Sequence, residues 1–363
     1  MNRNRHIVIV CSRLDLPGGI ERAVVSTAHL LSQTYQVTLL ILDQVSNSFY
    51  SIDSSVSVVH EDLTFGIQIP GNFLSRKWKL IQDIRRLRNI IRLIRPDFII
   101  GSEMVFSVSL VLAGARKYSK VLAWEHHHFL WLKPGSFWKA LRSITYPRLN
   151  GIVCLNQREA DLYRRLGKTD VIPNFIYSKT THSTLSNKEL LSIGWFIPRK
   201  GIDLLLAAAG IVLKQYPDWK WRLIGKGEME EQVRDFTEKE DLGNQLLVEA
   251  PQSEDLDHQY VGSSLFVLSS RSEAFPMVLL EALSFGVPCI SFDCESGPSD
   301  IITHGEDGIL VPKENVPALA DAIIQLIKEE EERKKMGEKA LENIKRFSPE
   351  VILKKWQVLL NEL

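Results

Sequence analysis

The sequence predicts an α/β protein built from two doubly wound parallel sheets, each in its own domain. Short, continuous apolar runs recur along the chain with helical patterns between them, which is typical of parallel strands covered on both faces. This alternation pauses at a polar segment over 174–189 and then restarts. A chain of 363 residues also exceeds what one hydrophobic core usually holds. We therefore expect one domain over 1–174 and a second over 175–348.

The first domain is expected to open with a strand, a glycine turn and a helix over 20–32. Apolar residues at helical spacing predict an amphipathic helix over 75–96. The strands expected in this domain are 6–11, 37–42, 98–101, 121–124, 151–155 and 169–172. In such a sheet the carboxyl ends of the strands meet at one edge, where ligands bind.

The second domain repeats the alternation of strands and helices. Its expected strands are 189–194, 221–225, 245–249, 265–268, 288–292 and 308–311. Helices are predicted over 201–215, 277–285 and 315–328, followed by a charged helical stretch. Ser348 before Pro349 is typical of a helix N-terminus. We expect this last helix, 349–363, to pack back on the first domain.

Composition excludes several classes of protein. The formal net charge is zero, so no global field attracts nucleic acid or anionic lipid. The four cysteines lack zinc-ligand spacing and are expected to be small buried side chains in a reduced compartment. No apolar window reaches the roughly 18 residues of a spanning helix, and the first strand is too short for a signal peptide. We expect a cytoplasmic protein, or one attached to the inner face of the membrane.

Two glutamates in the stretch RSEAFPMVLLEALSFGVPCIS (271–291) form the first candidate site. Glu273 follows an expected strand, and Glu281 lies eight positions later, within an expected helix. Pro276 suits the first position of that helix. Carboxylates accept hydrogen bonds from the paired hydroxyls of a ribose or sugar. The alternative interpretation is a pair of exposed glutamates near a helix.

Free N–H groups at the start of the same helix could hold a phosphate, with help from the helix dipole. The groups expected to do so are those around Phe275, Met277 and Val278. Arg199 and Lys200 also stand between a strand and a helix, where their charges could neutralise a diphosphate. A plain surface turn is the alternative for these two cations.

Gly18 and Gly19 lie between the first strand and its helix, so the backbone there could approach a ligand closely. The alternative is an ordinary strand-to-helix turn. Another strand ends in WEHHHF (124–129). Neighbouring side chains on an extended segment point to opposite faces, so the three histidines are not expected to share a metal ion. One of these imidazoles could instead bind a hydroxyl.

Together these segments resemble the retaining glycosyltransferases of family 4, over nearly the whole chain. The most specific match is EAFPMVLLE (273–281), which has the family's pair of glutamates, followed by ALSFGVPCIS. The other matching segments are GGIER (18–22), RKG (199–201) and ESGPSDIITHGEDGILV (295–311). The resemblance implies the GT-B fold, in which two Rossmann-like domains face each other across a cleft.

The resemblance also implies roles for single residues. Glu281 would bind the ribose of a nucleotide-sugar donor, Glu273 would face the donor sugar, and Lys200 would pair with the diphosphate. Gly19 would let the N-terminal loop approach phosphates or acceptor, and His126 would contact the donor sugar near the reacting carbon. The donor would be a UDP-sugar, the commoner family choice. No metal or other cofactor would be required, because lysine, arginine and N–H groups hold the diphosphate.

The implied reaction moves a hexosyl or N-acetylhexosaminyl residue to a glycan, with attack on the same face as departure. Two other functions stay open. One is a sugar-nucleotide 2-epimerase, which shares the architecture, and the other is a non-catalytic nucleotide-sugar-binding subunit. The chain departs from the family at Trp195, where an arginine that binds the diphosphate is usual. Whether Arg199 replaces that arginine is left open by the sequence.

The acceptor could be lipid-linked, because two segments of the first domain combine apolar and basic residues. On the expected helix over 75–96, the face opposite the apolar stripe is rich in lysine and arginine, with only Asp83 against them. The segment 129–149 adds aromatic residues among basic ones. Such a surface suits an anionic membrane. The alternative is a helix that covers the sheet with its apolar stripe and keeps a basic outer face. No motif supports nucleic-acid binding.

Overall fold

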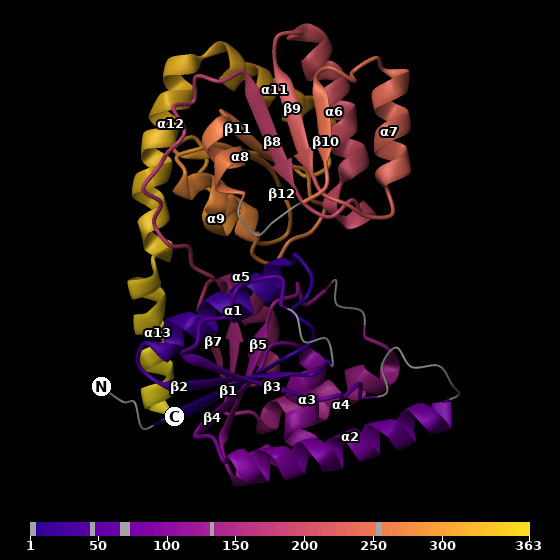
Figure 1. The fold of residues 1–363 in the computed structure, drawn as a ribbon, viewed down its shortest axis with the longest axis vertical. Coiled ribbons are helices and arrows are strands. Elements are labelled where there is room, and N and C mark those ends of the chain that lie inside the picture. The colour runs from indigo at the N-terminus through magenta and orange to yellow at the C-terminus, as the bar shows by residue number, and fades with distance from the viewer. Residues whose placement is uncertain (1–4, 44–47, 66–72, 131–133, 252–255) are drawn as a thin grey trace. The chain divides into compact units, whose positions relative to one another are not determined.

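The computed structural model describes residues 5–43, 48–65, 73–130, 134–251 and 256–363. The chain divides into two compact units (Figure 1). The first consists of Met1–Pro173 with Glu350–Leu363, and the second of Asn174–Pro349. The domain boundary expected from the sequence, between 174 and 175, lies one residue from the boundary between these units.

The first unit holds a seven-stranded sheet in which every strand pair is parallel, in the order β3-β2-β1-β4-β5-β6-β7. Its strands are β1 (His6–Cys11), β2 (Gln36–Ile41), β3 (Val56–His60), β4 (Phe98–Gly101), β5 (Lys120–Glu125), β6 (Gly151–Cys154) and β7 (Thr169–Val171). Sequence reasoning missed β3. This edge strand exposes Ser57 and Val58, so it lacks the continuous apolar run of the buried strands.

Helices cover both faces of this sheet. They are α1 (Gly19–Ser32), α2 (Phe73–Ile94), α3 (Met104–Leu112), α4 (Ser136–Thr145), α5 (Gln157–Tyr163) and α13 (Pro349–Glu362). The C-terminal helix α13 belongs to this unit although the chain reaches it only after completing the second (Figure 1). Buried Trp356 meets Trp124 edge to face with ring centroids 5.5 Å apart, and Arg5 Nη1 donates to Leu360 O at 3.3 Å.

Helix α2 covers the sheet with the predicted apolar stripe. Leu80, Ile84, Leu87 and Ile91 are buried in the core of the first unit, so this stripe is not available to a membrane. Asp83 is also on the inner side and buried, which corrects its placement on the basic outer face. Its carboxylate lies 2.8 Å from Lys79 Nζ and accepts hydrogen bonds from two backbone N–H groups of the preceding loop.

The second unit holds a six-stranded parallel sheet, in the order β10-β9-β8-β11-β12-β13. Its strands are β8 (Glu189–Ile193), β9 (Lys220–Ile224), β10 (Leu246–Glu249), β11 (Leu265–Leu268), β12 (Cys289–Asp293) and β13 (Gly308–Pro312). Its helices are α6 (Ile202–Gln215), α7 (Glu230–Lys239), α8 (Asp257–Gly262), α9 (Met277–Ser284), α10 (Pro298–Ile301), α11 (Val316–Lys328) and α12 (Glu330–Asn343). The predicted α/β class with two doubly wound parallel sheets is confirmed.

The polar segment over 174–189 connects the units but packs on the second. Phe175 and Leu185 are buried, and buried Arg333 of α12 donates from Nε and Nη2 to Leu185 O at 3.2 and 3.0 Å. The polar composition predicted a linker, whereas these contacts fix the segment to one unit. Among the residues that the structure describes, no helix is both long and apolar enough to cross a membrane.

Candidate functional site

The two predicted glutamates both occupy buried positions beyond the carboxyl end of β11. Glu273 lies in the loop after β11 and Glu281 in α9, and their exposed fractions are only 6% and 4%. The interpretation as exposed glutamates is therefore wrong. Pro276 is the N-cap of α9, with φ −71° and ψ 108°, and not its first helical residue as predicted. Buried carboxylates need partners, and each of these has them.

Glu273 is held by Lys200 and Ser270. Its Oε1 lies 2.5 Å from Lys200 Nζ and accepts a hydrogen bond from Ser270 Oγ at 2.6 Å. Burial by itself raises the pKa of Glu273, but the charges of Lys200 and Arg199 and the two hydrogen bonds outweigh it and leave this pKa lowered. The predicted cation and the predicted carboxylate are thus one charged pair, with the carboxylate ionised.

Glu281 accepts a hydrogen bond from the hydroxyl of Tyr260, in α8, at 2.5 Å. The Tyr260 ring is buried and stacks on Phe285 with centroids 5.3 Å apart. The tyrosine fixes one oxygen of the carboxylate and orients the group. Sequence reasoning missed Tyr260, because its short helix has no motif and reaches Glu281 only through the fold.

The start of α9 is covered by the ESG segment at 295–297. Ser296 Oγ donates to Glu273 O at 2.8 Å. Gly297 has φ +95°, and a Cβ there would lie 2.9 Å from Pro276 Cδ. Only glycine fits this close approach. Two segments that carry the family resemblance are therefore packed against each other. The first N–H groups of α9, those of Met277 and Val278, have no partners within the helix and form its positive end.

The cations lie on a turn before α6. Residues Pro198–Lys200 form one turn of 3-10 helix, and Gly201 follows with φ +65°. A Cβ at Gly201 would lie 2.0 Å from Ser269 O, so the turn and the loop after β11 are in direct contact. Arg199 is exposed, and its Nη1 donates to Ser272 O at 3.4 Å.

Where the family has its usual arginine, the ring of Trp195 faces a different cation. Lys226 Nζ lies 5.8 Å from the centroid of that ring. Lys226 is exposed and follows β9, at the same sheet edge as the glutamates. No motif marked this lysine in the sequence.

In the first unit, Gly18 is the N-cap of α1 and Gly19 its first residue. A Cβ at Gly18 would lie 1.9 Å from Glu21 Oε2. The glycine therefore makes room for the protein's own carboxylate, which folds back over the start of the helix. Burial raises the pKa of Glu21, and the neighbouring carboxylate of Glu103 raises it further. A close approach of ligand at Gly19 stays a prediction.

The three histidines after β5 occupy three environments. His126 is buried and packs against Trp124, with ring centroids 4.2 Å apart and the planes tilted by 56°. Its Nε2 has no hydrogen-bond partner within the described part of the chain. Burial lowers the pKa of His126 to about 3, so the ring is neutral. His127 is half-buried and lies 3.7 Å from a Glu103 oxygen, whereas buried His128 Nδ1 lies 2.5 Å from Glu159 Oε1.

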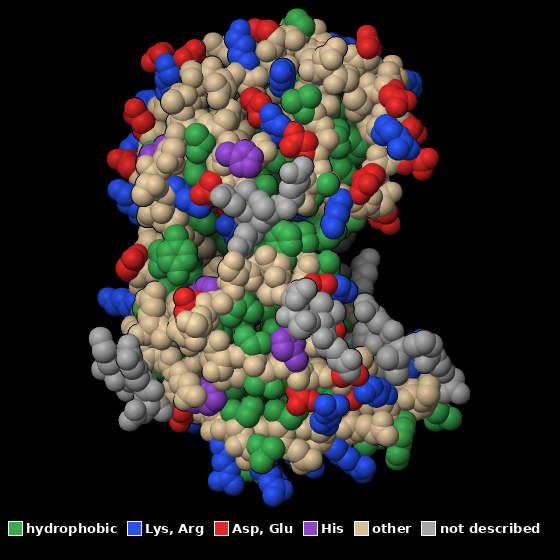
Figure 2. All heavy atoms as spheres, in the orientation of Figure 1, with side chains coloured by type: hydrophobic (Ala, Val, Ile, Leu, Met, Phe, Trp, Pro, Cys, Tyr) green, Lys and Arg blue, Asp and Glu red, His purple; other side chains and the backbone are tan. Residues whose placement is uncertain are grey.

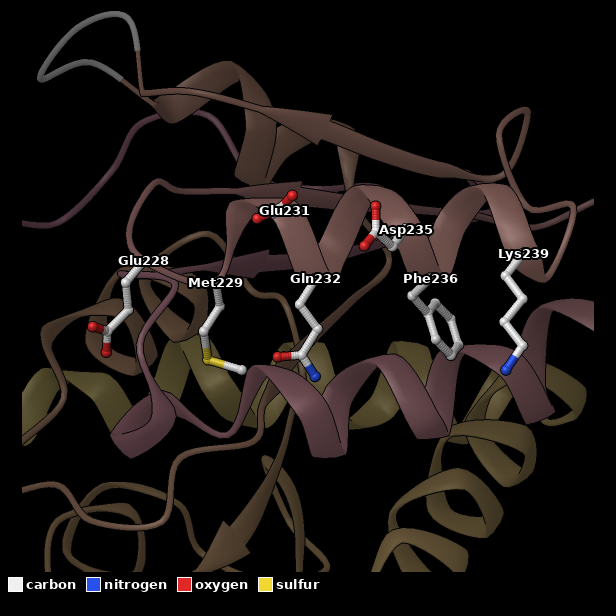
Figure 3. Close-up of a pocket in the computed structure, with 7 residues that line it drawn as sticks. All are labelled: Glu228, Met229, Glu231, Gln232, Asp235, Phe236 and Lys239. Atoms are coloured by element: carbon white, nitrogen blue, oxygen red, sulfur yellow. The ribbon is translucent and has the colours of Figure 1, made fainter.

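The rest of the described residues adds no metal centre and no pocket to the site. No group of three or more histidine, cysteine or acidic side chains there could hold a metal ion. A groove along α7 contains none of the predicted site residues (Figure 3). It is lined by Glu228, Met229, Glu231, Gln232, Asp235, Phe236 and Lys239.

Comparison with protein families divides the chain as its fold does. The family described as Glycosyl transferases group 1 matches residues 177–343, and Glycosyltransferase Family 4 matches residues 17–178. The two matches overlap at residues 177–178 and together leave only the ends of the chain uncovered.

Similar proteins act in polysaccharide assembly, according to their names. An exopolysaccharide phosphotransferase of Streptomyces coelicolor is 30% identical over 96% of this chain, which spans only 40% of that protein. The amylovoran biosynthesis glycosyltransferase AmsD of Erwinia amylovora is 28% identical, over 98% of this chain and 99% of that one. An N-acetyl-D-galactosaminyltransferase of Campylobacter jejuni, named for a PP-undecaprenol acceptor, is 25% identical over 95% of this chain and 96% of its own.

Solved structures share the fold at low sequence identity. TarM of S. aureus, in complex with fondaparinux, alpha-GlcNAc-glycerol and UDP, has a TM-score of 0.80 at 16% identity and covers 98% of this chain and 100% of its own. Sucrose-phosphate synthase of Thermosynechococcus elongatus has a TM-score of 0.84 at 17% identity, over 99% of this chain and 98% of its own.

Proposed function

The chain belongs to glycosyltransferase family 4 and has the GT-B fold, and from this premise we propose a transfer reaction. The proposed reaction moves a hexosyl or N-acetylhexosaminyl residue from a UDP-sugar to a glycan, with retention of configuration. The chain is a glycosyltransferase of polysaccharide biosynthesis, and its relative AmsD is named as a biosynthesis glycosyltransferase too. UDP as the nucleotide is supported by the TarM complex, which contains UDP. The identities of the transferred sugar and of the acceptor glycan are to be determined by experiment.

One observation carries the proposal for the donor. Beyond the carboxyl end of β11, the second unit has a buried carboxylate paired with a lysine, the start of helix α9, and a second buried carboxylate within that helix. In this proposal Glu281 accepts hydrogen bonds from the ribose hydroxyls. Glu273 accepts a hydroxyl of the donor sugar. The N–H groups of Phe275, Met277 and Val278 face the sugar or the diphosphate.

Departure of the nucleoside diphosphate needs fixed positive charge. Lys200 supplies it from a position that Glu273 holds before the donor arrives, so little reorganisation accompanies the reaction. Arg199 is exposed beside it and could move to the phosphates. We propose that these cations and the N–H groups of α9 act without a metal ion or other cofactor. Transfer in the presence of EDTA tests this part of the proposal.

His126 is proposed to contact the donor sugar. Its ring is neutral and its Nε2 is buried, so this nitrogen can accept or donate one hydrogen bond to a hydroxyl. Tight packing against Trp124 fixes the plane of the ring. Gly18 and Gly19 are proposed to face the acceptor, with the carboxylate of Glu21 beside them.

The test of the proposed function is a panel of nucleotide sugars. The correct donor should raise the melting temperature, because a ligand that binds only the native state stabilises it. Incubation of that donor with glycan acceptors should then release the nucleoside diphosphate and extend the glycan. Release of a 2-epimerised sugar nucleotide without acceptor would favour the epimerase, and donor binding without turnover would favour a non-catalytic subunit.

We further propose that the protein is peripheral on the inner face of the cytoplasmic membrane, where it meets a lipid-linked acceptor. The N-terminal end of α2 exposes a second apolar set, distinct from the buried stripe, with Leu74 and Trp78 exposed by 74% and 58%. Lysine and arginine side chains gather over α2 on the face shown in Figure 2, and hydrophobic side chains lie among them near this end. The name of the C. jejuni relative, which includes PP-undecaprenol, agrees with such an acceptor.

The segment 129–149 adds to this surface in the residues that are described. Phe137 at the start of α4 is exposed, and Lys77 Nζ of α2 lies 5.5 Å from the centroid of its ring. Aromatic and basic groups from two helices are therefore side by side. Trp131, which contributed to the prediction, lies outside the described residues.

Vesicle sedimentation at low and high salt tests the membrane proposal. The protein should sediment with vesicles that contain an anionic lipid at low salt and be released at high salt. Trp78→Ser should weaken this binding. Val358→Ser, a change of another exposed apolar residue on α13, should not. Equal binding of all three proteins, or no binding to anionic vesicles at low salt, would remove the proposal.

A further inference from the structure

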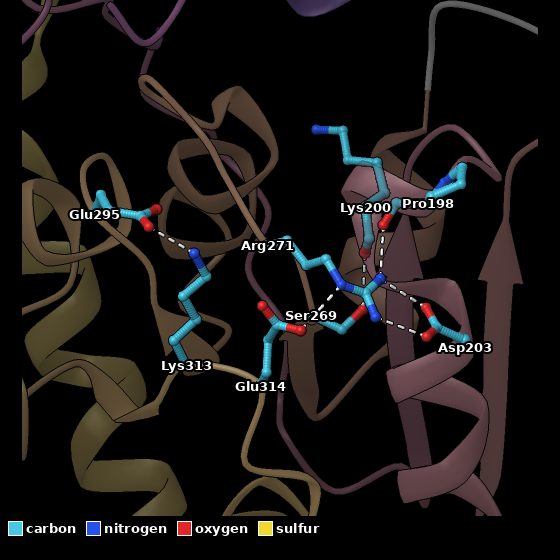
Figure 4. Close-up of polar contacts among 8 residues, drawn as sticks. All are labelled: Pro198, Lys200, Asp203, Ser269, Arg271, Glu295, Lys313 and Glu314. Atoms are coloured by element: carbon cyan, nitrogen blue, oxygen red, sulfur yellow. Dashed lines mark hydrogen bonds and ion pairs between the residues drawn. The ribbon is translucent and has the colours of Figure 1, made fainter. Parts of the chain in front are cut away.

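Arg271 lies in the loop after β11, two residues before Glu273, and joins three segments of the second unit (Figure 4). Its Nη1 donates to Pro198 O at 2.7 Å. Asp203 in α6 accepts from Nη1 and Nη2 at 2.8 and 2.7 Å, and Glu314 after β13 accepts from Nε at 3.1 Å. These four contacts use most of the five N–H groups of a guanidinium.

The same loop holds the backbone of the turn that carries the two cations. Three successive carbonyls of this turn accept hydrogen bonds from residues 269–271. Pro198 O accepts from the Arg271 guanidinium, Arg199 O from Arg271 N at 2.9 Å, and Lys200 O from Ser269 Oγ at 3.0 Å. The position of Lys200 therefore depends on how Arg271 and Ser269 hold the turn.

An arginine is required at this position for geometric reasons. The fork of Nη1 and Nη2 on Asp203 is bidentate, while Nη1 also reaches Pro198 and Nε reaches Glu314 on the other side. A lysine has one nitrogen and cannot reach all three partners at once. Hydrogen bonds to Asp203 raise the pKa of Arg271, so the group stays charged.

These contacts also show that Arg271 does not replace the family arginine missing at Trp195. Its guanidinium donates hydrogen bonds to Asp203, Pro198 and Glu314, so it is not available to bind a phosphate. Arg271 therefore contributes to the site by holding the turn of Pro198–Lys200.

We infer that Arg271 is a positioning residue, which sets the affinity for the donor diphosphate by fixing the turn of Arg199 and Lys200, and this inference rests on the proposed function. Arg271→Lys should leave the chain folded but let the turn shift. A displacement on the order of 1 Å of a group that binds or positions the substrate is enough to lower activity by about 100-fold. We expect the Kd for UDP and the donor KM to rise by about 10- to 100-fold, because hydrogen bonds to the charged diphosphate are weakened. The value of kcat should fall as well, because Lys200 also neutralises the departing diphosphate.

Arg222 provides a matched control in the same unit. Its side chain is 21% exposed, as that of Arg271 is, and it likewise pairs with two carboxylates, Glu189 and Glu249. None of its contacts involves the turn. A merely structural role for Arg271 predicts that Arg271→Lys and Arg222→Lys lower the melting temperature alike and leave UDP binding alike.

The experiment measures UDP binding by calorimetry, together with melting temperature, donor KM and kcat, for the full-length variants. The inference predicts weaker UDP binding in Arg271→Lys and wild-type binding in Arg222→Lys. Folded Arg271→Lys with wild-type UDP affinity overturns it. If Arg271→Lys does not fold, Asp203→Asn is used in its place, because the asparagine removes the negative charge and one acceptor from the bidentate pair. Wild-type UDP affinity of folded Asp203→Asn then overturns the inference.

Lys200→Ala separates this inference from the proposed function. If Lys200→Ala weakens UDP binding and Arg271→Lys does not, only the inference fails. If Lys200→Ala binds UDP as the wild type does, the proposed diphosphate site itself is wrong, and the inference falls with it.

Discussion

At the scale of single residues, the central feature is a buried carboxylate that stays ionised. Glu273 is nearly inaccessible, and its charge is balanced by Lys200 and by the hydroxyl of Ser270. A buried charge without partners would be costly, so each group of this set keeps the others in place. The arrangement gives a lysine a fixed position at the place where negative charge is expected to develop.

Glu273→Gln tests that arrangement. The amide is similar in shape but cannot balance the charge of Lys200, so we expect kcat/KM to fall by about 100-fold or more while the circular dichroism spectrum is unchanged. Glu331→Gln, at an exposed position on α12, is the control and should keep full activity. Full activity of Glu273→Gln at both low and saturating donor would contradict the role.

The pH dependence of stability follows from the lowered pKa of Glu273. Its ordinary value is 4.5, and the folded protein holds the ionised form more strongly than the unfolded chain does. Its contribution to stability is therefore present above pH 4.5 and is lost as the pH falls through the lower folded value. Urea unfolding should show wild type more stable than Glu273→Gln near neutral pH, with a difference that narrows below pH 4.5. A difference that widens in acid would reverse the assigned direction of the shift.

At the scale of elements, the candidate donor site depends on a close contact between the turn of Arg199 and Lys200 and the loop after β11. Gly201 combines φ +65° with a Cβ position 2.0 Å from Ser269 O, so the turn of cations and the loop after β11 can meet only at a glycine. This contact ties two segments that lie almost 70 residues apart in the sequence.

Gly201→Ala should therefore destabilise the protein by more than about 1 kcal/mol and weaken UDP binding, because the backbone must move to admit a methyl group. Gly243→Ala is the matched control, since a Cβ there meets nothing within 4 Å. Chemical unfolding and UDP titration of both variants measure the two effects. Equal stability of the two variants would show that the contact at Gly201 is unimportant.

The same scale shows what sequence could predict. The buried strands were predicted because a strand that is covered on both faces appears in the sequence as a continuous apolar run. Edge strand β3 was missed because Ser57 and Val58 face solvent. The glutamates and Lys200 were found because they lie between expected strands and helices or within such a helix, and the family resemblance then implied their roles. Tyr260 and Arg271 were not found, because their importance lies in contacts with Glu281 and Asp203, which no local periodicity encodes.

At the scale of the whole molecule, the chain completes its second unit and then returns to the first. Helix α13 closes the core of the first unit through Trp356, which packs on Trp124, and Trp124 in turn packs against His126. The last residues of the chain therefore support a candidate site residue that lies more than 200 positions earlier.

Trp356→Ala should remove that support. Truncation of a buried tryptophan costs about 3–5 kcal/mol, so the first unit should unfold at lower temperature than the second. Calorimetry of Trp356→Ala should show two unfolding transitions, one for each unit. The melting temperature of the second unit, which UDP stabilises, should be unchanged. Val358→Ala, at an exposed position of the same helix, should melt like the wild type. A single unchanged transition in Trp356→Ala would contradict the role of α13.

The most direct test of the central claim, that the edge of the second sheet grips a nucleotide sugar, is a titration of wild type and Glu281→Ala with UDP. Glu281 is buried and oriented by Tyr260, and in the proposed complex it accepts the ribose hydroxyls. We predict that UDP binds the wild type and binds folded Glu281→Ala at least about 10-fold more weakly, by the loss of hydrogen bonds to a charged group. Equal affinity of the two proteins for UDP, or no binding of any nucleoside diphosphate to the wild type, would contradict the account.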